Sequence, residues 1–143
     1  MSGLCRATNS VVLLAILGLT MTGCGESGPP RVSVTGKVTN KGEVLKVKPM
    51  VGRVQVTFYP VTEPGKPAGD PQEAAIQPTG DFTVPGTDRK GIAPGKYKIA
   101  VRQWEEFPNK DVLDGKFDDK NTKIIREITG KEPVVIDVSR DEG

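Results

Sequence analysis

Apolar and polar positions alternate with a period of two along most of the chain after residue 31. Successive side chains on a β-strand point to opposite faces, so this pattern predicts strands with one buried and one solvated face. Pro60 is expected to end the second of these strands. The expected strands cover residues 32–39, 54–59, 74–77, 82–84, 97–102 and 134–139.

Glycine and proline mark the expected turns. Pro78-Thr79-Gly80-Asp81 lies between two of the strands, which predicts a short hairpin. Pro94-Gly95 predicts a tight turn, in which proline fixes φ and glycine accepts a positive φ. Gly36 stands in the middle of the first strand, where a missing side chain permits a bulge or a close backbone approach.

The segment before the last strand has an ambiguous pattern. Ile124, Ile125 and Ile128 have helical spacing, but the polar residues 129–132 then lead directly into the last strand. We expect Lys123–Ile128 to form the first arm of a terminal hairpin. Arg126 would then lie near a sheet edge, where its guanidinium can reach water.

Three long loops separate the strands, at residues 46–53, 62–73 and 104–122. Loops this long are uncommon in small domains and are often functional or mobile. Within the longest loop, Asp111–Phe117 is expected to form one helical turn. Six or seven short strands with turns between them, and no helix of ordinary length, predict an all-β sandwich.

The first 23 residues have the layout of a signal peptide. Arg6 precedes the apolar run 11–19, which ends in small residues and is shorter than the roughly 20 residues of a membrane span. A buried helix or an uncleaved anchor is the alternative. We expect residues 1–23 to be a cleaved signal peptide, and residues 24–31, rich in Gly and Pro, to be a tether.

The exit of this segment, Thr22-Gly23-Cys24, resembles the lipobox of bacterial lipoproteins, although Met21 stands where leucine is more usual. The resemblance implies that the Cys24 thiol accepts diacylglycerol and that cleavage leaves a mature chain of 143 − 23 = 120 residues. More than one acyl chain is needed for stable anchoring. A Cys5–Cys24 disulfide is the alternative, and cleavage would separate its two partners.

Three parts of the mature chain resemble carboxypeptidase regulatory-like domains. They are Val34–Thr39, Val54–Pro60, and Gly80–Val84 followed by Ile92–Val101. The resemblance implies a seven-stranded, transthyretin-like or Ig-like β-sandwich, which we expect over residues 32–140. With the lipobox, the whole chain is similar to the small lipoproteins of planctomycete-type bacteria. These motifs identify a fold far better than a function.

The composition excludes several kinds of chemistry. The chain has no histidine, the commonest general base and metal ligand, and its second cysteine, Cys5, lies in the segment to be removed. The mature chain carries 19 basic and 18 acidic residues, a net charge of 19 − 18 = +1, with no nucleic-acid footprint. We therefore expect no enzyme activity, no cofactor and no nucleic-acid partner.

Two candidate sites fall in the longest loop. Asp111, Asp114 and Asp118 could supply oxygen ligands to calcium, although the neighbouring Lys116 and Lys120 oppose a cation and a solvated loop is favoured. The other site comprises Trp104, Glu105 and Phe107. Its aromatic rings could stack on a sugar while the carboxylate binds hydroxyls, but aromatic rings usually cover a core, and that interpretation is favoured.

Lys96, Lys98 and Arg102 share the outer face of one expected strand and could attract anionic polysaccharide or lipid head groups. The favoured interpretation is that they protect the sheet from aggregation. The leading hypothesis is a membrane-anchored lipoprotein of the cell envelope, with a non-catalytic binding or structural sandwich and possible envelope-protein or polysaccharide partners. Gly25 follows the lipidated cysteine where aspartate would signal inner-membrane retention, which favours the outer membrane or periplasmic face. A carbohydrate-binding module built on Trp104 and residues 104–122 is the alternative.

Overall fold

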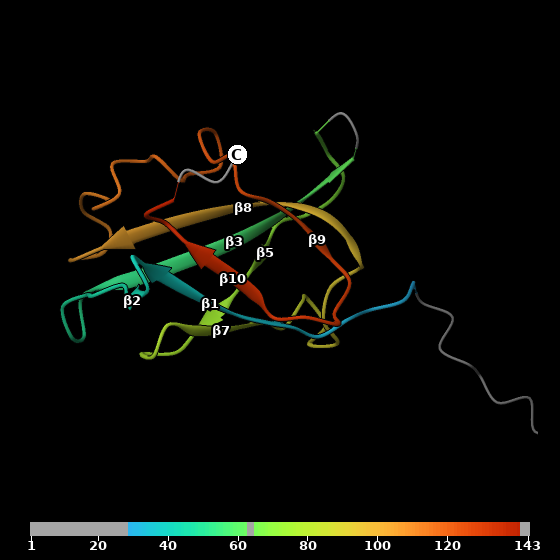
Figure 1. Cartoon of the computed structure of the whole chain (residues 1–143), viewed down its shortest axis with the longest axis horizontal. Helices are drawn as coiled ribbons and strands as arrows, with labels where there is room; N and C mark the ends of the chain where they lie inside the picture. Colours follow the sequence, from blue (N-terminus) through green and yellow to red (C-terminus); the bar gives the residue numbers. More distant parts are fainter. Residues whose placement is uncertain (1–28, 63–64, 141–143) are drawn as a thin grey trace, which may run out of the picture.

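Two β-sheets face each other in the computed structural model of the chain, which describes residues 29–62 and 65–140 (Figure 1). All the regular secondary structure within these ranges is β-strand. The fold is therefore all-β, as the alternating pattern predicts. Across the same ranges there is no helix with the length and apolar character needed to cross a membrane. Cys24 and the expected signal peptide lie outside the described residues.

The first sheet has the strand order β10-β1-β7-β6, and β2 also pairs with β1. β1 and β10 run parallel, while the other pairs of this sheet are antiparallel. The pairing of β6 with β7 confirms the hairpin expected around Gly80, which has a φ of 80°. The strands are β1 (Val34–Asn40), β2 (Glu43–Val44), β6 (Ala75–Ile76), β7 (Asp81–Val84) and β10 (Val134–Asp137).

The second sheet has the order β4-β3-β8-β9, and β5 also pairs with β3. Its centre is the long antiparallel pair of β3 and β8, which runs from Arg53 opposite Trp104 to Pro60 opposite Tyr97. The described residues thus form two five-stranded sheets rather than the seven strands expected in all. The strands are β3 (Arg53–Thr62), β4 (Lys66–Pro67), β5 (Gln72–Glu73), β8 (Gly95–Trp104) and β9 (Ile125–Ile128).

Pro60 does not end its strand, and that prediction was wrong. β3 continues through Pro60 to Thr62. Proline lacks only the backbone N–H donor. The carbonyl of Pro60 still accepts a hydrogen bond of 2.8 Å from the backbone N–H of Ala68. A proline near a strand end interrupts pairing only where its missing N–H is needed.

The terminal hairpin was also predicted wrongly. β9 pairs with β8 in the second sheet, whereas β10 pairs with β1 in the first sheet. The segment between them therefore crosses from one sheet to the other. Arg126 lies on β9, at the edge of its sheet and half-buried, as expected. Closeness in sequence favours a hairpin, but here each strand completes the edge of a different sheet.

The core lies between the sheets and is built from the alternate side chains of both. Phe58 occupies its centre, with ring centroids 5.8 Å from Phe82 and 6.1 Å from Tyr97. Tyr97 keeps its polar end satisfied, because its hydroxyl donates a 2.8 Å hydrogen bond to the Ala93 carbonyl. Burial raises the pKa of the Tyr97 phenol. Each fully buried aliphatic or Phe side chain contributes about 1.5–3 kcal/mol to folding.

Gly36 confirms the expected close approach. A Cβ atom at this position would lie 2.1 Å from the carbonyl oxygen of Val134 and 2.4 Å from Cζ of Phe82. The missing side chain lets β10 lie against β1 on one side while the Phe82 ring fills the core beside it. Gly95 has the positive φ expected of it, 149°, but it pairs with Ile128 as the first residue of β8 rather than forming the expected tight turn.

Candidate functional site: a groove at one end of the sandwich

Residues 105–122, which belong to the longest expected loop, cover the outer edge of β8 beyond β9. The backbone N–H of Val101 donates to the Phe117 carbonyl at 2.8 Å, and that of Val112 donates to the Gln103 carbonyl at 2.6 Å. Thr122 donates its hydroxyl to the Ile99 carbonyl at 2.7 Å, and the Phe117 ring lies in the core. This loop therefore protects a sheet edge from pairing with another chain.

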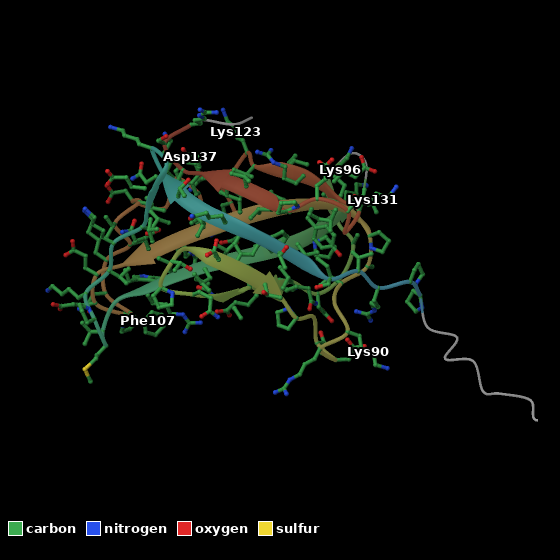
Figure 2. The ribbon with its side chains drawn as sticks, turned by 60° about the horizontal axis from the view of Figure 1, so that its bottom comes forward. Lys90, Lys96, Phe107, Lys123, Lys131 and Asp137 are labelled. Atoms are coloured by element: carbon green, nitrogen blue, oxygen red, sulfur yellow. The ribbon has the colours of Figure 1, made fainter. Side chains whose placement is uncertain are left out.

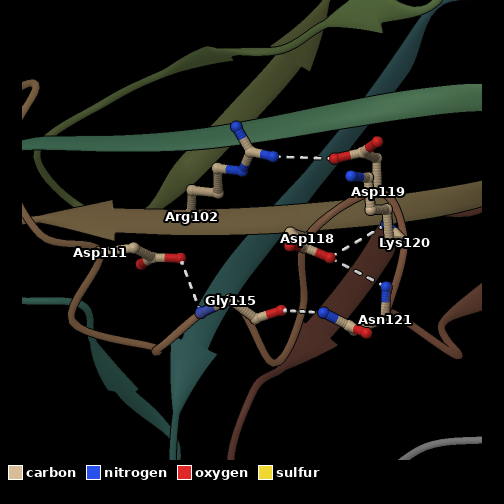
Figure 3. Close-up of polar contacts among 7 residues, drawn as sticks. All are labelled: Arg102, Asp111, Gly115, Asp118, Asp119, Lys120 and Asn121. Carbon is tan, nitrogen blue, oxygen red and sulfur yellow. Dashed lines mark hydrogen bonds and ion pairs between the residues drawn. The ribbon is translucent and has the colours of Figure 1, made fainter.

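The carboxylates of this loop hold its own backbone (Figure 3). Asp111 accepts hydrogen bonds from the backbone N–H groups of Gln103 at 2.9 Å, Leu113 at 3.1 Å and Gly115 at 3.3 Å. Asp118 accepts from the backbone N–H of Asn121 at 2.9 Å and from that of Lys120 at 3.0 Å. These bonds, that of Asn121 foremost, lower the pKa of Asp118.

The three aspartates do not converge on a point. Asp114 pairs with Lys110 at 2.9 Å, away from the hydrogen bonds of Asp111 and Asp118. Within residues 29–62 and 65–140, no three or more Cys, Asp or Glu side chains gather as metal ligands would. The structure therefore gives no support to the calcium alternative.

The helical turn expected at Asp111–Phe117 is not formed, so that prediction was wrong. The backbone there makes consecutive turns instead. The backbone N–H of Asp114 donates to the Asp111 carbonyl at 3.0 Å, and that of Lys116 donates to the Leu113 carbonyl at 3.0 Å. Asp114 and Gly115 have φ values of 51° and 72°, in the left-handed region that interrupts a right-handed helix.

The aromatic site of the carbohydrate alternative is mostly closed. Trp104 is only 8% exposed at the end of β8, and its ring meets the Phe107 ring edge-on at 5.1 Å. Phe107 is 49% exposed, but the Arg53 guanidinium lies 5.3 Å from its ring centroid. Glu105 is exposed beside them. A buried indole offers no face for stacking on a sugar, so this arrangement argues against the carbohydrate alternative.

The basic residues of β8 lie on its outer face, as expected, while the residues between them are buried. Lys96 is exposed, and Lys98 and Arg102 are half-buried. Arg102 forms a 2.8 Å ion pair with Asp119 of the covering loop (Figure 3). This face is therefore partly occupied by the chain itself.

A groove of about 950 Å³ opens between the segment 43–54 and the segment 73–80. Sequence reasoning missed it, because its walls come from segments that are distant in the chain. The one signal was the set of apolar residues 44, 45 and 47, which continue past the expected end of the first strand. The apolar lining includes Val44, Leu45, Val47, Ala75, Ile76 and Pro78.

Charged pairs hold the rim of this groove in place. Lys48 forms an ion pair with Glu106, and Arg53 forms one with Glu73. The hydrogen bond between Lys48 and Glu106 raises the pKa of the lysine and lowers that of the glutamate. The charged side chains Lys48, Glu106, Arg53 and Glu73 are thus paired with each other. The groove itself therefore offers a mainly apolar surface to a ligand.

The loop above the groove is tightly built but ends in exposed apolar side chains. Gly52 N–H donates to the Lys48 carbonyl at 2.8 Å, and a Cβ at Gly52 would lie 2.5 Å from Cβ of Val47. Phe107 N–H donates to the Val51 carbonyl at 2.8 Å and so connects this loop to the segment after β8. Met50 is fully exposed and Val51 is 48% exposed. Two exposed apolar side chains thus lie at the tip of this loop.

The groove lies at the end of the sandwich opposite the entry of residue 29. β1 runs from the end where residue 29 enters to the end where residues 41–52 form the groove wall (Figure 1). A tether attached at the first end would hold the groove away from its attachment point. No family model, curated protein or solved structure matches the chain. The resemblance to carboxypeptidase regulatory-like domains therefore rests on the quoted residues alone.

Proposed function

We propose that this protein is a lipid-anchored lipoprotein of the cell envelope whose β-sandwich is a non-catalytic binding module. The binding site is the groove between residues 43–54 and 73–80. Its partner is an exported protein that inserts apolar side chains from an extended segment. The observation that carries this proposal is the apolar groove at the end of the sandwich opposite the entry of residue 29.

The anchor is supported by sequence. An apolar run, small residues and Cys24 follow one another in the order that lipoprotein export requires. The described domain is compatible with such an anchor, because Pro29 and Pro30 lie at one end of the sandwich. A domain carried in this way acts through what it meets near the membrane, and the periplasmic face of the outer membrane is the proposed site.

The binding role is supported by the chemistry of the groove. Apolar lining with ion-paired charges around it is the arrangement found in protein-binding sites, where an apolar centre is surrounded by a polar rim. Ile76 and Ala75 belong to β6, the edge strand of the first sheet. An extended segment could therefore lie along this edge and place alternate side chains in the groove.

Photocrosslinking in the producing cells tests the proposal. A photoreactive residue at Met50, on the groove rim, should give a discrete adduct with an exported protein. The matched control is Val135, which is 62% exposed on β10 and remote from the groove. Ala75→Arg places a charge on the groove wall, so it should remove the Met50 adduct while leaving the melting temperature nearly unchanged.

Two results would contradict the groove as the binding site. One is an adduct pattern at Met50 that is no different from the pattern at Val135. The other is a Met50 adduct that persists at full yield in the folded Ala75→Arg protein.

A further inference from the structure

Three segments meet at the end of the sandwich where residue 29 enters: residues 29–33, 85–96 and 128–133. Val32 and Ile92 exchange two backbone hydrogen bonds, of 2.8 Å and 3.0 Å. Gly130 lies against Val32, since a Cβ there would be 2.5 Å from the Cβ of Val32. This end is therefore a fixed surface of the domain, directly beside the point of attachment.

Basic side chains dominate this surface, which we call the basic end. The exposed cationic residues there outnumber the acidic ones, which are Asp88, Glu132 and Glu127, the register partner of Lys96. The excess of positive charge among these residues of the basic end is 5 − 3 = +2. The five basic residues are Arg31, Arg89, Lys90, Lys96 and Lys131.

Figure 2 shows how these side chains lie. Lys90, Lys96 and Lys131 are at the end of the sandwich where residue 29 enters, whereas Phe107 and Asp137 are at the other end. Arg31 is the basic residue nearest the tether and donates to the Gly91 carbonyl at 3.4 Å. The positive charge is thus gathered on the one surface that a lipid anchor at Cys24 would bring close to a membrane.

We propose that the basic end docks on the anionic lipid bilayer that carries the anchor. This inference rests on the proposed lipoprotein function and adds an orientation to it. The eight residues 24–31 span at most about 28 Å when fully extended, so the tether permits contact without enforcing it. Basic side chains near an anionic surface are attracted within roughly one Debye length, about 10 Å at moderate salt. Docking would hold the groove at the far end, facing away from the membrane.

Amine labelling of the full-length lipidated protein on vesicles tests the proposal. One vesicle is phosphatidylcholine alone, and the other contains phosphatidylglycerol as well. Lys90, Lys96 and Lys131 should react at least three-fold more slowly on the anionic vesicles, and roughly molar salt should restore their rates, because it shortens the Debye length to about 3 Å. Lys46 and Lys110 are internal controls, with side chains 90% and 82% exposed outside the basic end.

A pair of variants makes the test specific. Lys90→Glu with Lys131→Glu reverses two charges of the basic end, and it should abolish the slower labelling of Lys96 on anionic vesicles. Lys46→Glu with Lys110→Glu makes the same charge change elsewhere and should leave that slower labelling intact. Both variants are checked for an unchanged melting temperature in neutral vesicles.

The failures of the two proposals are distinguishable by flotation. If the protein floats with both vesicles but its lysines react at equal rates on them, the anchor stands and the docking is overturned. If the protein floats with neither vesicle, the anchor itself is overturned, and the docking proposal falls with it.

Discussion

Substitution of Gly36 by alanine should destabilise the domain strongly, because the added methyl group has no space between β1, β10 and the core. The added Cβ would lie 2.1 Å from a backbone oxygen of Val134 and 2.4 Å from Cζ of Phe82. The backbone oxygen belongs to β10, whose register partner at Val134 is Gly36 itself. The ring cannot retreat either, because Phe82 is 2% exposed and packed against Phe58.

The magnitude follows from these contacts. Forcing an extra carbon into a filled core costs about 1–3 kcal/mol, and the displaced β1–β10 pairing places Gly36→Ala at the upper end, about 3 kcal/mol. For a domain of this size, each kcal/mol lowers the melting temperature by about 4 °C. We therefore expect Gly36→Ala to melt about 12 °C below the wild type.

Thermal unfolding by near-ultraviolet circular dichroism measures this change. Gly42→Ala is the matched control, because Gly42 has a φ of 78° but nothing within 4 Å of its added Cβ. Its free energy of unfolding should fall by only about 1 kcal/mol, the cost of the backbone strain of an alanine in the left-handed region. The reasoning is refuted if Gly36→Ala melts no lower than Gly42→Ala.

Two further predictions concern Asp137, which lies at the end of the sandwich opposite the basic end, and Phe117 of the loop that covers the edge of β8. Asp137 accepts hydrogen bonds from Ser139, Lys41 and Gly42, which lower its pKa to about 2, so the carboxylate stabilises the fold above pH 4 and that stability is lost as the pH falls from about 4 to about 2. The unfolding midpoint of Asp137→Asn should therefore fall less steeply than that of the wild type between about pH 4 and about pH 2. Parallel curves for the two proteins would contradict the stabilising role of the Asp137 carboxylate. Phe117→Ala should lower the free energy of unfolding in urea by about 3–5 kcal/mol, because the Phe117 ring is 5% exposed and lies in the core. A loss below about 1 kcal/mol would mean that the covering loop is not part of the core.

The strands that could be predicted from sequence are those whose pattern is local. Alternation alone located the buried faces of β1, β3 and β8, since period two is a property of the strand itself. The close approach at Gly36 could be predicted for the same reason: a glycine within a strand leaves space for a neighbour. Which neighbour fills that space was not predictable, because β10 lies almost a hundred residues further along the chain.

The errors concern relations between distant segments. The terminal hairpin was wrong because the choice between pairing β9 with β10 and completing two separate sheets depends on which edges are open. The groove was missed because residues 43–54 and 73–80 meet only in the folded domain. The carboxylates of residues 111–118 suggested a ligand site, yet they satisfy backbone N–H groups, which no residue pattern reveals.

The most direct test of the account is acylation of Cys24 in the producing cells. Cells are fed an alkyne-bearing fatty acid, and the purified protein is examined by click labelling and intact mass. The wild type should carry the label and have the mass of a chain that begins at an acylated Cys24. Cys5→Ser is the matched control and should be labelled equally, whereas Cys24→Ser should carry no label. An unlabelled wild type, or a Cys24→Ser protein labelled like the wild type, would contradict the lipoprotein account.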